Sequence, residues 1–310
     1  MKWIQKTFLL TLISTMLTGC ISSKDNGIDS FFIDANEEIV THIHGIGYLG
    51  SNQTLFIATH HGLLKFSDDK WFKTNKNNHD YMGFQTTDNG FFSSGHPSLK
   101  SNLKNPLGIM KSTDQGNTLE KIKFYGEIDF HYLAASYYNH TLYVYNEHPN
   151  SLTVGLHYSI DGGESWQQSE MNGVSANSIG NIATHPNNPE NISISTNKGL
   201  FVSSNFGNDF ELLSPNTPVT TVEYQENSLI YFQVEKEDIK LINVELQNKD
   251  SKEIPLPEDV SRENPVLFLT TNPSNREEIT LVTANNSIFQ TKDNGQTWAY
   301  ILENGKVSNN

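Results

Sequence analysis

The chain has 310 residues, with 35 acidic and 21 basic side chains, a formal net charge of −14 and a single cysteine. Nucleic-acid backbones are bound by basic patches, so this balance argues against a nucleic-acid partner and favours cations among charged ligands. One cysteine excludes an internal disulfide and a cysteine-based zinc site. Apolar residues make up 36% and aromatic residues 11%, enough for a folded core rather than a disordered chain.

The first twenty residues have the pattern of an export signal. Lys2 and Lys6 precede a mainly apolar run from Phe8 to Met16, which is far shorter than the ~20 residues that a membrane span needs. The small residues before Cys20 resemble the lipobox of bacterial lipoproteins, which implies lipidation of Cys20 and an anchor on the extracytoplasmic face of the cell membrane. An ordinary signal with a chance cysteine is the alternative. The expected segments are a signal peptide at 1–19, a lipidated tether at 20–30 and one folded domain at 31–310.

A short motif recurs along the rest of the chain. Its clearest copies begin at Ser159, as SIDGGESW, and at Thr291, as TKDNGQTW. The six marker positions, 43 to 47 residues apart, are Asp68, Asp114, Asp161, Asn205, Asp250 and Asp293. Short runs of alternating apolar residues, bounded by Asn, Pro and Gly, precede each copy and indicate strands in hairpins. Four strands per repeat is typical of a propeller blade. We therefore predict an all-β, six-bladed β-propeller; a seventh blade would need about 45 more residues.

The motif Ser/Thr-x-Asp-x-Gly-x-x-Trp resembles the Asp-box, or BNR repeat, of β-propellers such as sialidases, sortilin-type receptors, xyloglucanases and photosystem assembly factors. The resemblance covers nearly the whole predicted domain and concerns fold rather than function. It implies a hairpin between the third and fourth strands of each blade, held by side-chain to backbone hydrogen bonds, with Gly at positive φ and Trp between blades. Structural roles, not catalytic ones, are therefore expected for Asp114, Gly116, Asp161, Gly163, Trp166, Asp293, Gly295 and Trp298.

The resemblance also invites an enzymatic interpretation. A sialidase holds the carboxylate of its substrate with three arginines, whereas this chain contains only Arg262 and Arg276, which excludes an ordinary sialidase. A glycoside hydrolase that uses two carboxylates remains open, with Asp129 and Glu147, or Glu127, as candidates.

Eight of the eleven histidines fall in three consecutive predicted blades, at the start of a first strand or at the end of a second strand. In a propeller, these two positions lie at the same rim. His42 and His44 are two residues apart and point to one side, whereas only one of His60 and His61 can face the centre of the rim. Imidazoles without cysteines suit Cu(II), Zn(II) or Ni(II). The expected metal ligands are His42, His44, His60, His61, His96, His131 and His148, with Asp129 and Glu147 as further ligands or as hydrogen-bond partners of the imidazoles. The eighth rim histidine is His79.

Several alternatives accompany the metal hypothesis. The histidines could be separate hydrogen-bonding residues. The rim could instead bind a protein or a glycan through aromatic residues, for which the candidates are Tyr81, Phe84, Phe130 and Tyr132. The segments HIHG at 42–45, THHG at 59–62, GHP at 95–97 and DFH at 129–131 are similar to those of bacterial lipoproteins labelled glycosylhydrolase-like or BNR-repeat proteins.

The leading hypothesis is thus a monomeric, lipid-anchored binding module for Cu or Zn. A glycoside hydrolase or a surface interaction scaffold is the alternative. How the ring closes is left open, and Phe31–Ile33 could add a strand to the last blade.

Overall fold

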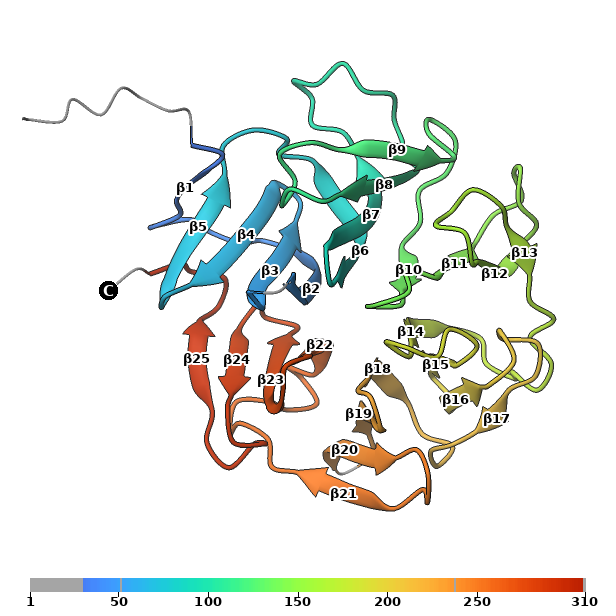
Figure 1. Cartoon of the computed structure of the whole chain (residues 1–310). Coiled ribbons are helices and arrows are strands. Elements are labelled where there is room, and N and C mark those ends of the chain that lie inside the picture. The colour runs from blue at the N-terminus through green and yellow to red at the C-terminus, as the bar shows by residue number, and fades with distance from the viewer. Residues whose placement is uncertain (1–29, 51, 237, 309–310) are drawn as a thin grey trace, which may run out of the picture. The chain divides into compact units, whose positions relative to one another are not determined.

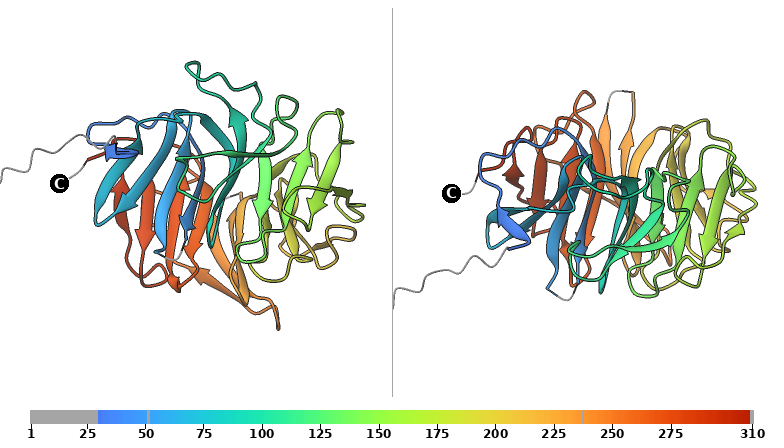
Figure 2. Two further views of the ribbon diagram at one scale, coloured as in Figure 1. Left: turned by 45° about the horizontal axis from the view of Figure 1, so that its top comes forward. Right: turned by 90° about the horizontal axis from the view of Figure 1, so that it is seen from above.

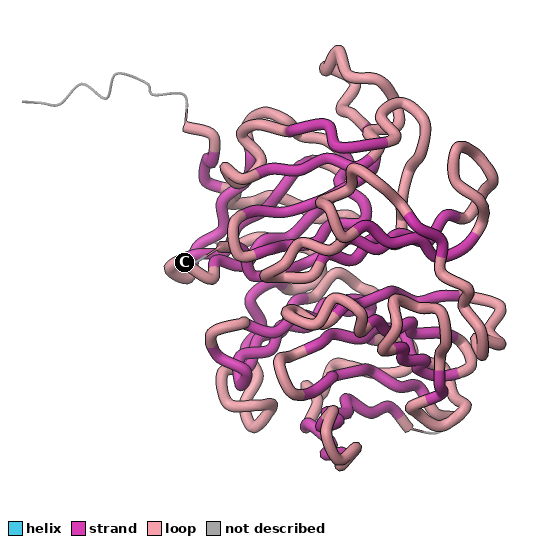
Figure 3. Tube along the Cα trace, turned by 45° about the vertical axis from the view of Figure 1, so that its right-hand side comes forward, coloured by secondary structure: helices cyan, strands magenta, loops and turns pink. Residues whose placement is uncertain are grey.

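The computed structural model describes residues 30–50, 52–236 and 238–308, which form six β-sheets arranged as a β-propeller (Figure 1). No helix occurs in this part of the chain, as the tube in Figure 3 shows. The predicted all-β fold with six blades is confirmed. Cys20, and the segments predicted on either side of it up to residue 29, lie outside the described residues.

A separate finding concerns membrane spans. Within the described ranges, no helix is long and apolar enough to cross a bilayer.

Each blade is an antiparallel meander of four strands taken from one continuous stretch of chain, numbered from the centre outwards. Blade 1 consists of β2 (Ile43–Leu49), β3 (Thr54–Thr59), β4 (Gly62–Ser67) and β5 (Lys70–Thr74). Blade 2 consists of β6 (Asp80–Thr87), β7 (Gly90–His96), β8 (Ile109–Ser112) and β9 (Glu120–Lys123). Blade 3 consists of β10 (Tyr132–Ala135), β11 (Leu142–Asn146), β12 (Gly155–Ser159) and β13 (Gln167–Gln168).

The second half of the ring repeats this order. Blade 4 consists of β14 (Ile179–Thr184), β15 (Ile192–Thr196), β16 (Gly199–Ser203) and β17 (Glu211–Leu212). Blade 5 consists of β18 (Val219–Tyr224), β19 (Ser228–Val234), β20 (Ile239–Glu245) and β21 (Ser251–Ile254). Blade 6 consists of β22 (Val266–Asn272), β23 (Asn275–Thr283), β24 (Ile288–Thr291) and β25 (Ala299–Leu302). The strands run between the two faces of the propeller (Figure 2), so a blade's first strand starts, and its second strand ends, at the same face.

Strand β1 (Phe32–Asp34) joins blade 1, not blade 6. It pairs antiparallel with β5, from Phe32 opposite Thr74 to Asp34 opposite Phe72, and makes blade 1 a five-stranded sheet. The aromatic side chains give a reason, because Phe32 contacts Phe56 edge to face at 5.9 Å and lies under the Lys65 ammonium at 4.3 Å. The possibility that this segment extends the last blade is therefore wrong.

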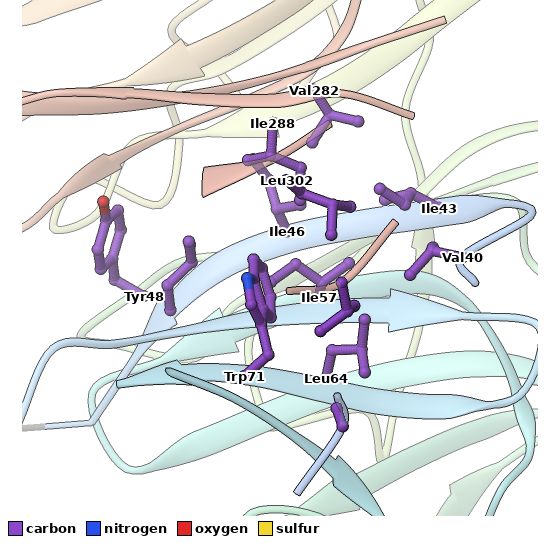
Figure 4. Packing of buried hydrophobic residues seen from close by; sticks show 13 residues of the cluster. Val40, Ile43, Ile46, Tyr48, Ile57, Leu64, Trp71, Val282, Ile288 and Leu302 are labelled. Atoms are coloured by element: carbon purple, nitrogen blue, oxygen red, sulfur yellow. The ribbon is translucent and has the colours of Figure 1, made fainter. Parts of the chain in front are cut away.

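The ring closes where blade 6 meets blade 1. Ile39 and Lys306 form an antiparallel bridge, and Val40 N–H donates to the Gly305 carbonyl at 2.7 Å. The Trp71 indole of blade 1 donates to the carbonyl of Ile301 in blade 6 at 2.8 Å. The buried side chains at this junction, drawn in Figure 4, include Val40, Ile43, Ile46, Tyr48, Ile57, Leu64, Trp71, Val282, Ile288 and Leu302.

A cluster of buried apolar side chains like this one lies between every pair of adjacent blades. Between blades 1 and 2, for example, Phe56 and Leu63 meet Tyr81, Phe84 and Phe91. Burying each such side chain contributes about 1.5–3 kcal/mol. The stability of the ring therefore resides in its blade junctions, and the same junctions position the polar side chains at the rim.

The repeated motif forms the turn between the third and fourth strands. In blade 3, Ser159 Oγ donates to Asp161 Oδ1 at 2.7 Å and accepts the Gly163 N–H at 2.8 Å, while Ser165 N–H donates to Asp161 Oδ1 at 2.9 Å. Gly163 has φ +100°. The equivalent atoms make the same contacts in blades 2, 4 and 6. These turns set the outer edge of the blades and lie on the face opposite the histidines described below.

Candidate metal centre

The first strand of blade 1 presents His44 through a β-bulge. Ile43 pairs with Thr59 and Gly45 pairs with Ala58, so His44 is the extra residue on its strand. A bulge bends its strand and redirects the side chain that it carries. His44 is partly buried as a result, with a side chain that is 11% exposed.

A tight turn at the end of the second strand positions His60. Thr59 and Gly62 pair across the turn, and Thr59 Oγ1 accepts the His61 N–H at 3.0 Å while donating to the Gly62 carbonyl at 2.9 Å. The turn is tied to blade 2 because the Gly62 N–H donates to the carbonyl of His79 at 3.0 Å. The next residue, Asp80, opens β6 and so faces the turn from the neighbouring blade.

His44, His60 and Asp80 form a compact cluster at the junction of blades 1 and 2. His44 Nε2 lies 3.3 Å from His60 Nδ1 and 3.2 Å from Asp80 Oδ1, and His60 Nδ1 lies 2.9 Å from Asp80 Oδ2. One ligand atom from each residue falls within 4.8 Å of the other two. Asp80 Oδ1 is buried and makes no hydrogen bond of good geometry with any described residue.

The electrostatics of the cluster keep Asp80 ionised. Burial by itself would raise the pKa of Asp80, but the two facing imidazoles outweigh it and lower the pKa to about 2. His42 is held towards its neutral form, because burial and the neighbouring His44 and His60 all lower its pKa. A carboxylate therefore faces imidazole nitrogens, the donor types that Zn(II) and Cu(II) accept.

The spacing of these atoms fits a metal ion. At bond lengths of about 2.0–2.1 Å, two tetrahedral ligands of zinc lie about 3.3 Å apart. His44 Nε2 lies 3.3 Å from His60 Nδ1 and 3.2 Å from Asp80 Oδ1, and both separations are close to that value. The His44, His60 and Asp80 cluster could hold a metal ion.

Two further histidines border the cluster. The ring of His42 lies 5.0 Å from that of His44, in a stacked arrangement, and 4.9 Å from that of His60. His61 is exposed and turns away, with its ring 6.3 Å from that of His60. Of the adjacent pair, His60 is thus the one that enters the cluster.

A second polar group lies at the junction of blades 2 and 3. His96, the last residue of β7, places Nε2 3.2 Å from Asp129 Oδ2, and His131 Nε2 lies 3.5 Å from the same oxygen. His131 Nδ1 lies 2.9 Å from Glu147 Oε2, and His96 Nδ1 lies 2.7 Å from Asn105 Oδ1. In this group His131 stands between two carboxylates, with a hydrogen bond to Glu147 and a longer contact to Asp129.

The proposed catalytic carboxylates belong to this group. Asp129 and Glu147 both face His131, and Glu127 lies apart from them, where its Oε1 accepts the Ser151 N–H at 3.1 Å. Glu147 and His131 also line a cavity of about 610 Å³ on the propeller axis. Glu147 and His131 thus adjoin a space large enough for a small ligand.

The other histidines take separate positions. His79 is 2% exposed, accepts the Ser98 N–H at 3.0 Å and has its pKa lowered by burial. His148 is exposed in the loop after β11. His140 lies 2.7 Å from Asp88, and His185 lies 2.9 Å from the Glu226 carbonyl, both in turns between first and second strands. The seven predicted ligands therefore divide between two junctions and the loops beside them.

The aromatic side chains expected to offer contact area on the rim do not do so. Tyr81, Phe84 and Phe130 are each 1% exposed, because they fill the junctions between blades. Of the four, Phe84 and Tyr132 line the axial cavity.

Asp80 is the residue that sequence reasoning missed as a ligand. Its signal was its register, since it opens the first strand of blade 2 just as Asp129 precedes the first strand of blade 3. The end of one blade's second strand lies beside the start of the next blade's first strand. A histidine at the end of the second strand can therefore contact an aspartate at the start of that first strand.

Comparisons with solved structures support the fold. The GH74 enzyme of Niastella koreensis is 16% identical with a TM-score of 0.58, over 87% of this chain and 47% of that one. YCF48 bound to a D1 peptide is 13% identical with a TM-score of 0.52, over 87% and 85% of the two chains, and YCF48 from Cyanidioschyzon merolae is 11% identical with a TM-score of 0.52, over 90% of both. No protein-family model and no curated protein sequence matches the chain.

These similarities place the chain in the β-propeller class. The chain spans about half the length of the GH74 enzyme, and at such identities the likeness shows the fold alone. What distinguishes this propeller must be sought in its own side chains.

Proposed function

We propose that this protein is a metal-binding β-propeller that holds Cu(II) or Zn(II) through His44, His60 and Asp80. The observation that carries the proposal is the convergence of three ligand atoms from two blades within 4.8 Å. The buried Asp80 Oδ1, which lies 3.2 Å from His44 Nε2 without a hydrogen bond of good geometry, supports it further. The two imidazoles and the carboxylate would bind the ion, and their placement on strand ends and in a tight turn would fix its position.

His42 is the side chain best placed to join as a fourth ligand. Its ring lies within 5.0 Å of both ligand imidazoles, and the residue is exposed. Three ligands from strand ends and a tight turn, with a fourth from an exposed side chain or from water, would suit capture and release of the ion better than a closed structural site.

The proposal is tested by calorimetric titration of the purified protein, carrying no histidine tag, with CuCl₂ and ZnCl₂. One ion per chain is expected, with binding lost or weakened at least tenfold in His44→Ala and in Asp80→Asn. His148→Ala is the matched control, because it removes an exposed imidazole outside the cluster. Binding that is equally strong in wild type and His44→Ala would refute the assignment.

The place of action is part of the proposal. The lipobox-like sequence before Cys20 supports an anchor on the extracytoplasmic face of the membrane, where an external metal ion would be met first. In cell fractionation, the wild type should sediment with membranes and Cys20→Ser should not. Recovery of both proteins in the same fraction would contradict lipidation.

A glycoside hydrolase is the second candidate, favoured by the position of Glu147 and His131 on the wall of the axial cavity. Turnover of a β-glucan or another polysaccharide that disappears in Glu147→Gln and persists in Glu127→Gln would establish it. No hydrolysis across a polysaccharide panel would leave the metal-binding proposal in place.

A further inference from the structure

The cavity on the propeller axis has features that the metal cluster does not account for. Its volume is about 610 Å³, and its wall is built from the first strands of all six blades. Sites for small molecules have volumes of about 300–1,000 Å³ and combine an apolar wall with a few polar groups. The aromatic members of this wall are Tyr48, Phe84, Tyr132, Tyr137, Tyr138, Tyr224 and Phe268.

Glu223 is the unusual polar group of this wall. It lies on β18, and no basic side chain of the described chain forms an ion pair with it. Its hydrogen-bond partner is the hydroxyl group of Thr270 on the adjacent blade. A carboxyl group that is shielded from water normally has a charged partner or several donors.

Thr221 adds a hydroxyl group that lacks a partner among the described residues. It is 1% exposed, and its Oγ1 makes no hydrogen bond with any described residue. Residues two apart on a strand point to the same side, so the side chains of Thr221 and Glu223 share one face of β18. Both residues line the cavity.

The other carboxyl groups of the wall already have partners, unlike the hydroxyl group of Thr221. Glu226 accepts a hydrogen bond from Asn187 at 2.6 Å, and Glu147 lies 2.9 Å from His131. The remaining ionisable groups of the wall, besides its tyrosines, are His44 and Arg276. Three carboxyl groups against one guanidinium favour a cationic occupant.

We propose that the axial cavity binds a small organic ammonium ion, a protonated alkylamine, with its charged nitrogen at Glu223 and Thr221. An ammonium group only donates hydrogen bonds, which matches a carboxylate beside a hydroxyl group with a free lone pair. The alkyl chain would contact the apolar wall, and the tyrosine rings would attract the positive charge. A Ca²⁺ ion would need six to eight oxygen ligands, more than this part of the wall offers.

The environment of Glu223 makes binding sensitive to pH. Burial raises the pKa of Glu223 to about 8, although the Thr270 hydroxyl opposes the shift. Of the elements packed against β18, none of β14, β15, β19 and β22 contributes a titratable side chain to the wall. The other ionisable wall residues of blades 5 and 6 are Tyr224 and Glu226, which follow Glu223 along the chain, and Arg276. An ammonium ion must therefore displace the proton of Glu223 below pH 8, which weakens binding about tenfold for each unit by which the pH lies below 8.

The test is calorimetric titration of the full chain with n-butylammonium, n-butanol and butyrate, in phosphate at pH 6, 7 and 8 and in borate at pH 9. EDTA is present throughout, so that the outcome does not depend on metal at His44. We expect n-butylammonium to bind most tightly, with an affinity that rises up to pH 8 and then levels, since an alkylammonium keeps its charge at pH 9 as lysine does.

Two variants connect binding to the site. Glu223→Gln should weaken n-butylammonium binding at pH 8 by at least tenfold, and Thr221→Val should weaken it severalfold. Glu211→Gln, the same change at an exposed carboxylate of β17, should have no effect. Thermal unfolding of each variant establishes that it is folded. Equal affinity for n-butylammonium and n-butanol, or unchanged binding by folded Glu223→Gln, would overturn the proposal.

Discussion

Glu223 also makes the stability of the propeller depend on pH, and the effect has a definite sign. Its pKa is raised to about 8 in the folded protein, against about 4.3 in an unfolded chain. Between these values the folded state holds a proton that the unfolded state has lost. The free energy of unfolding therefore falls as pH rises from about 4.3, and it stops falling above pH 8.

The size of the effect follows from the interval between the folded and the unfolded pKa of Glu223. Each pH unit between the two pKa values corresponds to 1.36 kcal/mol, so the step from pH 6 to pH 8 removes at most about 2.7 kcal/mol. Glu223 faces a cavity that water can enter, which reduces the burial penalty. We therefore expect a loss of about 1–2.5 kcal/mol.

The assay is urea denaturation at pH 6 and pH 9, followed by tryptophan fluorescence, in phosphate and borate so that no amine buffer enters the cavity. Glu223→Gln keeps the shape of the side chain and removes its titration. Between pH 6 and pH 9 the free energy of unfolding should therefore fall less in the variant than in wild type, by about 1–2.5 kcal/mol. Other groups titrate equally in both proteins and cancel in the comparison. An identical pH dependence in wild type and variant would refute the reasoning.

Three further outcomes test other parts of the molecule. Trp71→Phe loses the hydrogen bond to the Ile301 carbonyl and should lower the free energy of unfolding by about 1–2 kcal/mol, measured by urea denaturation. Ser159→Ala leaves the Gly163 N–H without its partner and should lower the free energy of unfolding by about 1–3 kcal/mol. Ser159→Thr reproduces Thr291 of blade 6 and should lower it far less. Equal losses in the two variants would contradict the assigned hydrogen bonds. ZnCl₂ at a hundredfold excess over its dissociation constant should stabilise wild type by about 2.7 kcal/mol and leave His44→Ala unchanged in thermal unfolding.

The repeat made the architecture predictable. A motif at near-constant spacing, preceded by short alternating runs, allows little besides a ring of similar blades. Even the copies that have lost the motif keep its place: Asp68 and Asp69 adopt φ of 54° and 56°, which is a two-residue hairpin turn between β4 and β5. The strand β1 was not predictable in the same way, because three residues outside the repeat carry no register signal.

The histidines show where sequence reasoning stops. Register placed His44 and His60 at one rim, and their side chains meet. It did not show that the rim divides into separate junctions, because the repeat assigns each histidine to a blade but does not give the direction or reach of its side chain. Glu223 was missed for a different reason: within Thr-Val-Glu-Tyr it occupies an alternating polar position that is normally solvent-facing, and only closure of the ring encloses it.

The closing seam has a consequence for how the protein reaches its folded state. Residues 305–307 bridge to 38–40, so blade 1 receives its last neighbour only after the chain as far as residue 307 has been made. Until then the apolar face around Trp71 and Ile46 is exposed to water and to other chains. A chain that ends before Val266 would lack blade 6 and leave the apolar side chains of blade 1 at this junction uncovered, so we expect such a chain to aggregate.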